Sequence, residues 1–306
     1  MAAIQDPGSV ADVREALGEV GYLADEPAAL VAYLAQRLGK PVLVEGPAGV
    51  GKTELAKAIA RATRRRLIRL QCYEGLDESK ALYEWNYRKQ LLRIQAETGG
   101  DGDGAGWDAV HGDIFSEEFL LTRPLLQAIA ATEPAVLLID EIDKTDQEFE
   151  AMLLEVLSDF QISIPELGVI EARTHPIVVL TSNNSRELTE ALKRRCLYLW
   201  LDYPEVEREM EIVRLHAPEL DERLARRVVE VVHMVRQLDL KKPPSIAESI
   251  DWARALLLLG ADDIDSSLFA RTMSIIVKHR TDMDLVAERV GMRLGGVEGL
   301  GAGAAG

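Results

Sequence analysis

Residues 46–53 have the sequence Gly46-Pro47-Ala48-Gly49-Val50-Gly51-Lys52-Thr53. They match the GxxxxGK[ST] phosphate-binding loop at every specified position. The apolar residues 41–44 come directly before this loop, and the alanine-rich residues 54–60 come directly after it. These flanks predict a strand, a loop and a helix in that order, which is the context that the motif requires. The lysine, the threonine and both flanks disfavour the alternative, a chance glycine-rich turn.

The residue types of the loop suit the triphosphate of a nucleotide. Gly46, Gly49 and Gly51 allow several backbone N–H groups to turn toward phosphate oxygens, which larger side chains would block. Lys52 provides a cation for the β and γ phosphates, and Thr53 provides a hydroxyl for Mg²⁺. The helix that follows presents its positive N-terminal end to the same anion. We therefore expect a site for a nucleoside triphosphate and magnesium.

The composition is that of an acidic globular protein. The chain has 306 residues, of which 47% are hydrophobic, and this length predicts one large domain and a small one. Its 35 basic and 51 acidic residues give a net charge of −16. A protein this acidic does not hold DNA or RNA chiefly by neutralising phosphates, so we expect no nucleic-acid partner unless a local basic patch supplies a contact.

Cysteine usage and hydropathy bear on the compartment. Cys72 and Cys196 lie far apart and match no metal or redox spacing, which favours a reducing cytoplasm. The N-terminal residues lack the basic and then apolar pattern of a signal peptide, and no apolar run reaches membrane-spanning length. We therefore expect a cytoplasmic protein without a membrane partner.

Apolar runs alternate with helical periodicities as far as Tyr203. Runs typical of buried parallel strands occur at residues 41–44, 67–71, 135–139, 177–180 and 197–201. Helical patterns lie at residues 11–38, 54–60, 122–132, 146–160 and 187–193. This alternation predicts an α/β fold with a parallel sheet and right-handed crossovers. Residues 162–164 and 169–172 predict an inserted β-hairpin.

After Pro204 the pattern changes to helices alone. These are predicted at residues 205–215, 221–238, 245–259 and 265–277. We therefore expect an αβα nucleotide-binding domain at residues 1–203 and a small all-helical lid domain at residues 204–290. The sequence of residues 291–306 is rich in glycine and alanine, and it predicts a disordered tail.

The segment at residues 73–118 is the least regular. Its first half predicts a helix with an aromatic face, which would carry Tyr83, Trp85, Tyr87, Leu91, Leu92 and Ile94. The glycine-rich residues 99–106 then predict a flexible loop. The aspartates of this loop leave a calcium site as the alternative, but the EF-hand pattern would need a third ligand position and a terminal glutamate.

Two carboxylates follow the apolar run at residues 136–139. Asp140 and Glu141 should lie at the carboxyl edge of the sheet, which is where ligands bind in open α/β folds. Asp140 would hold magnesium through its water shell, and Glu141 would orient or deprotonate the water that attacks the γ-phosphate. An acidic strand end followed by a helix is the alternative, and the phosphate-binding loop makes it the weaker one.

Two further segments supply candidate catalytic residues. Asn183 follows the strand at residues 177–180, where its amide could bond the attacking water or the γ-phosphate; otherwise it is a turn residue. Arg194 and Arg195 close a helix, a position that favours cations for dipole reasons alone. In a ring, an arginine there could reach the γ-phosphate bound by the neighbouring subunit.

The order of these motifs resembles the AAA+ ATPases and, within them, the MoxR family. The resemblance is carried by residues 46–53, 140–143, the hairpin after Phe160, residues 181–183 and residues 191–196. It extends over nearly all residues from about 20 to 279. Residues 71–77 and 83–87 look like the branch that is encoded beside carbon monoxide dehydrogenase.

The resemblance implies properties that the residues alone do not. It implies ATP hydrolysis with magnesium in a homo-oligomer that forms a hexameric ring. It also implies a partner with a von Willebrand A domain and a metalloenzyme client, whose molybdenum and copper site the protein helps to mature. By position, Arg195 matches the arginine finger of the family best, and Arg194 is next. Base contacts would come from the turn near Tyr22 and from the lid.

One departure from the family concerns the lid. Ile246 stands where many relatives carry a second sensor arginine, and Arg254 lies two helical turns further along. Two other functions stay open beside the ATP-driven remodeller. One is a nucleotide-switched assembly scaffold in which binding matters more than hydrolysis. The other is an NTPase that acts on nucleic acid, which the net charge of −16 disfavours.

Overall fold

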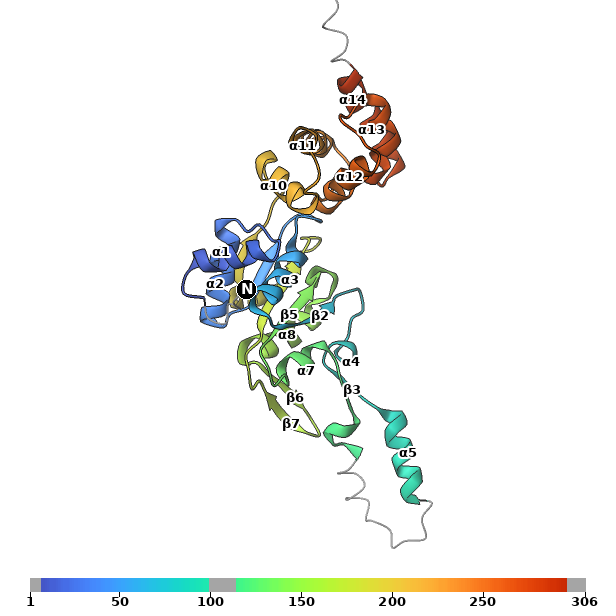
Figure 1. Ribbon diagram of the computed structural model, residues 1–306. Helices are drawn as coiled ribbons and strands as arrows, with labels where there is room; N and C mark the ends of the chain where they lie inside the picture. The colour runs from blue at the N-terminus through green and yellow to red at the C-terminus, as the bar shows by residue number, and fades with distance from the viewer. Residues whose placement is uncertain (1–6, 99–113, 296–306) are drawn as a thin grey trace, which may run out of the picture. The chain divides into compact units, whose positions relative to one another are not determined.

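The computed structural model describes residues 7–98 and 114–295, without the side chains of residues 96–98 and 291–295. Its contacts divide the chain into two units (Figure 1). The sheet unit consists of Met1–Gly46 with Lys52–Trp200, and the helical unit consists of Pro47–Gly51 with Leu201–Gly306. The predicted α/β fold with a parallel sheet and a helical C-terminal region is confirmed.

The sheet unit is built on five parallel strands in the order β2-β5-β8-β1-β9. Their bounds are β1 Val42–Glu45, β2 Arg66–Gln71, β5 Ala135–Asp140, β8 Ile177–Ser182 and β9 Leu197–Trp200. β5 and β8 are buried along their whole length, as expected of continuous apolar runs in the middle of a parallel sheet. The register pairs Asp140 with Gln71 and Ser182 with Glu45, so the polar strand ends lie along one edge.

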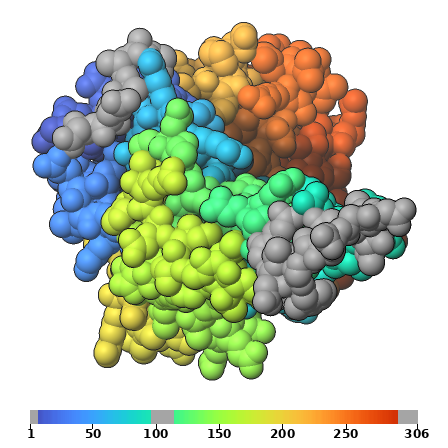
Figure 2. Space-filling model, turned by 90° about the horizontal axis from the view of Figure 1, so that it is seen from below, coloured from blue at the N-terminus to red at the C-terminus, as the bar shows by residue number. Residues whose placement is uncertain are grey.

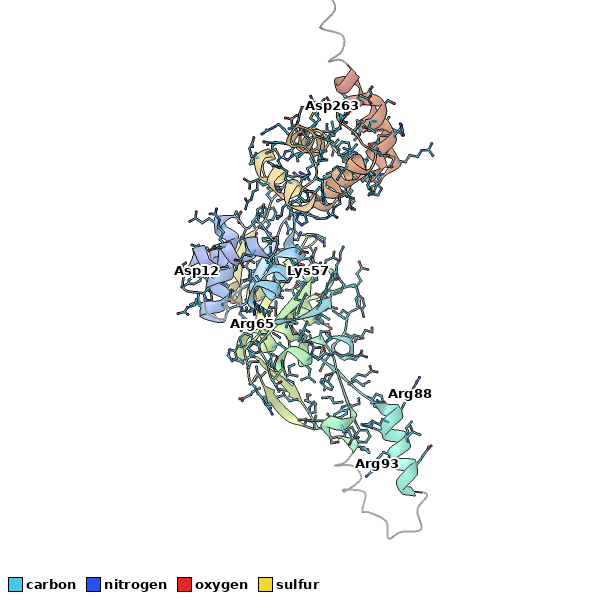
Figure 3. The ribbon with its side chains drawn as sticks, viewed as in Figure 1. Asp12, Lys57, Arg65, Arg88, Arg93 and Asp263 are labelled. Atoms are coloured by element: carbon cyan, nitrogen blue, oxygen red, sulfur yellow. The ribbon has the colours of Figure 1, made fainter. Side chains whose placement is uncertain are left out.

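The principal helices of the sheet unit are α1 Val10–Glu19, α2 Glu26–Leu38, α3 Lys52–Thr63, α7 Pro124–Ile129, α8 Gln147–Asp159 and α9 Glu190–Arg195. Capping side chains fix where several begin. Ser9 and Asp12 form a capping box at α1, and Figure 3 labels Asp12 there. The Thr189 hydroxyl accepts the N–H of Leu192, so α9 begins at Glu190 rather than at residue 187.

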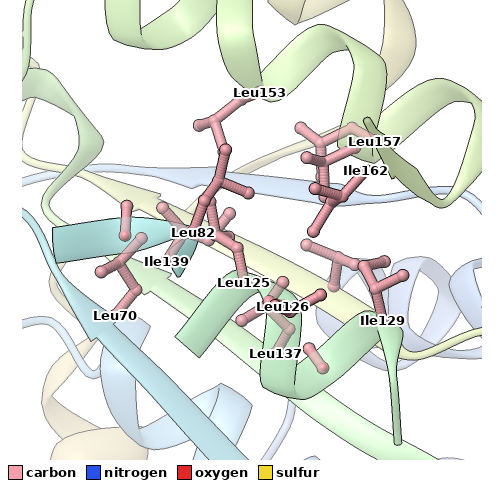
Figure 4. Packing of buried hydrophobic residues seen from close by; sticks show 14 of the residues in the cluster. Leu70, Leu82, Leu125, Leu126, Ile129, Leu137, Ile139, Leu153, Leu157 and Ile162 are labelled. Carbon is pink, nitrogen blue, oxygen red and sulfur yellow. The ribbon is translucent and has the colours of Figure 1, made fainter. Parts of the chain in front are cut away.

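One apolar core packs α7, α8 and a β-hairpin against a face of the sheet. Its members include Leu137 of β5, Leu125 and Ile129 of α7 and Leu153 of α8 (Figure 4). Full burial of each such side chain stabilises the fold by about 2 kcal/mol relative to exposure. The predicted hairpin is present as β6 Gln161–Ile164 and β7 Gly168–Glu171, on the face seen in Figure 2.

A β-α-β insertion separates α4 Glu78–Ala81 from α7. It contains β3 Tyr83–Trp85, α5 Tyr87–Thr98, the 3-10 turn η1 Glu117–Phe119 and β4 Leu120–Thr122 (Figure 1). The prediction of one helix from residue 83 onward is wrong, because Tyr83 and Trp85 belong to a strand that pairs antiparallel with β4. Trp85 is buried and packs edge-on against Phe115, with ring centroids 5.2 Å apart. The predicted flexible loop and the calcium alternative lie outside the described residues.

The helical unit contains α10 Val206–His216, α11 Glu222–Arg236, α12 Ile246–Leu258, α13 Ser266–Thr272, η3 Met273–Ile275 and α14 Arg280–Gly295. Its apolar core includes Val228 and Val232 of α11 and Trp252 of α12. α14 is a helix that the sequence reasoning missed, and it extends past residue 291, where the tail was expected to begin. The rest of that tail lies outside the described residues. Within the described residues, no helix is long and apolar enough to span a membrane.

A buried ion pair ties α10 to α11 in the helical unit. Glu209 is fully buried, and its Oε1 accepts a hydrogen bond from Arg236 Nη2 at 2.8 Å and another from Ser249 Oγ at 2.7 Å. His233 Nε2 lies 2.9 Å from the other carboxylate oxygen. The Arg236 guanidinium also lies over the ring of Tyr203, 4.3 Å from its centroid.

Candidate active site

The phosphate-binding loop joins β1 to α3, and its backbone uses conformations that favour glycine. Gly49 and Gly51 have φ values of +81° and +99°. At Gly49 a side chain is excluded by the positive φ and also by space, because a Cβ there would lie 2.2 Å from Ser245 Cβ in the helical unit. Two groups of that unit hold the loop: the Tyr203 hydroxyl donates to Ala48 O at 3.0 Å, and the Ile246 N–H donates to Gly49 O at 3.1 Å.

Lys52 lies at the start of α3 and is buried. Its Nζ donates to Gly46 O at 2.7 Å and to Asn183 Oδ1 at 2.8 Å, so the loop and the end of β8 meet at this ammonium group. Burial lowers the pKa of Lys52 below its usual value, although the nearby carboxylates of Asp143, Asp140, Glu141 and Glu45 act in the opposite direction.

Asp140 ends β5 and is the most heavily bonded carboxylate of the site. It is 2% exposed. Its Oδ1 accepts from Thr53 Oγ1 at 2.9 Å and from Thr181 Oγ1 at 2.5 Å. Its Oδ2 accepts from Arg69 of β2, with Nη2 at 2.6 Å and Nε at 3.1 Å. The side chains of the predicted magnesium ligands Thr53 and Asp140 are therefore in direct contact.

Glu141 follows Asp140 with a left-handed backbone, at φ +59° and ψ +49°. This conformation costs a non-glycine residue of order 1 kcal/mol or more, and such strain is concentrated at functional sites. The Glu141 N–H donates to Thr181 Oγ1 at 2.9 Å. Thr181 thus bridges both carboxylate residues, a role that the sequence reasoning did not assign to it.

Asp143 is a second site residue whose role was not predicted. It is buried, and its carboxylate accepts from Asn183 N at 3.2 Å, from Ser185 N at 3.0 Å and from Ser185 Oγ at 2.5 Å. Burial raises the pKa of Asp143, but these hydrogen bonds outweigh it, and the pKa lies below its usual value. Asp143 therefore fixes the backbone that carries Asn183.

The two candidate arginine fingers differ in their surroundings. Arg195 donates through Nε to Ser158 Oγ and through Nη1 to Ala191 O at 3.3 Å, so α8 and α9 hold its guanidinium. The Arg194 side chain is 82% exposed, and its Nε lies 4.0 Å from Glu190. Both residues lie on the last turn of α9.

The contacts of Tyr22, Arg254 and Ile246 are as follows. Tyr22 lies in the turn between α1 and α2, where its N–H donates to Leu17 O at 2.8 Å. The Arg254 guanidinium donates to the backbone carbonyl of His216 through Nε at 3.2 Å and Nη2 at 3.0 Å. Ile246 contacts the loop through its backbone N–H, described above.

Comparisons with known proteins place these features in a family. A family model described as "ATPase family associated with various cellular activities (AAA)" matches residues 42–199. The gas vesicle ATPase GvpN of Haloferax mediterranei is 24% identical over 279 residues, which cover 86% of this chain and 76% of that protein. Gas vesicle ATPase GvpN1 of Halobacterium salinarum is 25% identical over 214 residues, covering 66% of this chain and 57% of that protein.

Among solved structures, the Thermotoga maritima RuvB Holliday junction branch migration motor matches with a TM-score of 0.48 and 18% identity, covering 89% of this chain and 73% of that one. The family model alone spans more than half of the chain, from β1 to β9. The resemblance that the motifs indicated is confirmed at this level: the chain belongs to the AAA family of ATPases.

Proposed function

We propose that this chain hydrolyses ATP with the help of magnesium, using residues of the loop, β5 and β8. The observation that carries the proposal is that the loop, the end of β5 and the end of β8 meet. Lys52 donates a hydrogen bond to Asn183, and Thr53 donates one to Asp140. Their strand ends lie along one edge of the sheet, where open α/β folds bind ligands.

The residues of the loop fit a triphosphate. The positive-φ residues Gly46, Gly49 and Gly51 give the loop a backbone that can turn N–H groups toward phosphate oxygens. Lys52 would pair with the β and γ phosphates. It would then exchange its present acceptors, Gly46 O and Asn183 Oδ1, for phosphate oxygens.

Thr53 and Asp140 fit a magnesium site, because both offer the hard oxygen atoms that this ion prefers and their oxygens lie 2.9 Å apart. Magnesium, when bound, would offset the charge of the β and γ phosphates. Asp140 would accept hydrogen bonds from the water shell, as a carboxylate does at many magnesium sites that hold a nucleotide.

Glu141 and Asn183 are the proposed catalytic residues. Glu141 would orient the attacking water and accept its proton. Thr181 holds the left-handed backbone of Glu141 at the end of β5. Glu141 is only half-buried there, so water can reach it. Asn183 would bond the water or the γ-phosphate once Lys52 has turned to the nucleotide.

A turnover assay tests this assignment. Glu141→Gln should retain binding of a fluorescent ATP analogue and lose nearly all phosphate release, whereas Lys52→Ala should lose binding. Glu148→Gln, which removes an exposed carboxylate from the first turn of α8, serves as the matched control and should behave as wild type. Undiminished phosphate release by Glu141→Gln would exclude Glu141 as the catalytic base.

We further propose that the protein acts as a homo-oligomeric ring in which an arginine of α9 reaches the neighbouring site. Members of its family are commonly oligomeric rings. Arg194 has the more exposed side chain, and Arg195 matches the family position. Mixed rings of Glu141→Gln subunits with either Arg194→Ala or Arg195→Ala subunits would show which arginine completes a neighbour's site. If neither arginine substitution alone lowers the ATPase rate, a role in trans is contradicted.

The proposed biological role is remodelling of a client protein in the manner of MoxR proteins, with a metalloenzyme such as a carbon monoxide dehydrogenase as client. Its support is the resemblance in residues 71–77 and 83–87. Co-purification with a partner that carries a von Willebrand A domain, and ATP-dependent activation of that enzyme, would test it. The two relatives described above are named for gas vesicles, and a gas vesicle protein as the co-purifying partner would overturn the metalloenzyme assignment.

A nucleotide-switched scaffold is the second candidate. It is favoured if Glu141→Gln, which should trap ATP, keeps full biological activity while Lys52→Ala abolishes it. The position of Glu141 supports hydrolysis instead, because its half-buried carboxylate directly follows Asp140, the proposed magnesium residue, where it could orient a water molecule.

A further inference from the structure

Arg69 contacts the carboxylate that would hold the metal, although no motif includes it. It lies on the edge strand β2, near the carboxyl end of that strand, and its side chain is 47% exposed. Its partner Gln71, two residues along the same face, accepts a hydrogen bond from the same guanidinium. The guanidinium thus reaches from the edge of the sheet to the end of the neighbouring strand β5.

All acceptor positions of Asp140 are occupied. A carboxylate has two oxygens with about four lone-pair sites. Thr53 and Thr181 donate to Oδ1, and two N–H groups of Arg69 donate to Oδ2. Waters around a magnesium ion are hydrogen-bond donors, so they can bond Asp140 only after one of these donors leaves.

Arg69 is the donor that can leave at the lowest cost. Thr181 is 1% exposed, and its hydroxyl also accepts the N–H of Glu141, so its release would disturb one buried and one partly buried hydrogen bond. Thr53 is itself a proposed metal ligand and can keep its hydrogen bond to Asp140. The half-exposed Arg69 guanidinium can instead be hydrated when it leaves, and a magnesium ion with its waters would supply new positive charge and new donors to the Asp140 carboxylate.

We propose that Arg69 is a positioning residue that occupies Asp140 in the nucleotide-free protein and competes with magnesium for it. Arg69 thereby sets the magnesium concentration at which metal and nucleotide bind together. This inference rests on the proposed function, because it takes Asp140 as the residue that holds the metal. A unit charge about 6 Å from a divalent ion in water changes its binding about tenfold, and this sets the expected size of the effect.

The test measures the magnesium concentration that half-saturates binding of a fluorescent ATP analogue, at fixed low analogue concentration. Arg69→Gln removes the charge and should lower this concentration about tenfold. Arg69→Lys keeps the charge but cannot donate two hydrogen bonds side by side as a guanidinium does. Its half-saturating magnesium concentration should therefore lie between those of wild type and Arg69→Gln. Arg66→Gln removes an exposed charge from the start of the same strand and should match wild type.

The outcomes separate this inference from the proposed function. If the wild-type protein binds no analogue at any magnesium concentration, the proposed function fails and this inference fails with it. If wild type binds but Arg69→Gln needs as much magnesium or more, only the competition between Arg69 and the metal is overturned. Should Arg69→Gln not fold, as judged by circular dichroism, an unchanged magnesium requirement in Arg69→Lys overturns it equally.

Discussion

Thr181 provides the sharpest test of how the site is held together. Its hydroxyl donates to Asp140 at 2.5 Å and accepts the Glu141 N–H at 2.9 Å, and the residue is 1% exposed. Thr181→Val keeps nearly the same volume but leaves a buried carboxylate without one donor and a backbone N–H without its acceptor. Each such loss costs about 1–3 kcal/mol, so the free energy of unfolding of the sheet unit should fall by about 3 kcal/mol.

The ATPase rate should fall as well, because the Glu141 backbone loses the bond that holds its left-handed conformation. We expect turnover to fall about tenfold to a hundredfold, because a displacement of about 1 Å in a catalytic group can cost about a hundredfold in rate. Urea unfolding followed by circular dichroism measures the first effect, and phosphate release at saturating ATP and magnesium measures the second.

Thr63→Val is the matched control for this experiment. Thr63 is also a buried threonine of the sheet unit, and its hydroxyl donates to the Ile59 carbonyl at 2.7 Å within α3. The same hydroxyl also lies 3.5 Å from the Ala60 carbonyl, and the loss of this one neutral donor costs about 1 kcal/mol. If the two variants lose the same free energy of unfolding to within about 0.5 kcal/mol, the stabilising role of the Thr181 bridge is refuted.

Three further predictions follow from other contacts. Tyr203→Phe removes the hydrogen bond to Ala48 O but keeps the ring under Arg236, so the dissociation constant of the ATP analogue should rise about threefold. The control Tyr198→Phe removes a hydrogen bond to Glu45 and should leave this dissociation constant unchanged. The pKa of Asp143 is lowered in the folded protein, so its stabilising contribution is present above the unfolded value of 3.8 and is lost as the pH falls through the folded value. Asp143→Asn lacks this contribution, so its free energy of unfolding should fall less steeply than that of wild type below about pH 4. An equally steep fall in both proteins would contradict this. Burial raises the pKa of Cys72 and Cys196 to about 12, so iodoacetamide at pH 8 should modify both far more slowly in the folded protein than in urea, and equal rates would show that they are not protected.

Local patterns were sufficient to predict the sheet, the loop and the hairpin. Continuous apolar runs identify β5 and β8 because both faces of a central parallel strand are buried. The insertion was misassigned at Tyr83 and Trp85, although their spacing of two is the period of a strand. α14 was missed because its polar and apolar residues show little segregation along the helix.

The supporting residues of the site could not be predicted in the same way. Arg69 and Asp140 come from different strands, and the contact between them depends on the pairing of β2 with β5, which no local pattern specifies. In the sequence Asp143 is only part of an acidic segment, and its partner Ser185 follows β8, beyond α8 and the β6–β7 hairpin. Catalytic motifs are local in sequence, whereas the groups that orient them are not.

The hydrogen bond from Ile246 to Gly49 makes a backbone amide into a reporter of the loop. At the first position of α12 this N–H has no acceptor within its own helix, and its partner is a loop carbonyl instead. Its protection from deuterium exchange therefore depends on the loop rather than on the helix. A single exchange rate, read by mass spectrometry or NMR with and without nucleotide, would follow the state of residues 47–51 without an attached probe or a mutation.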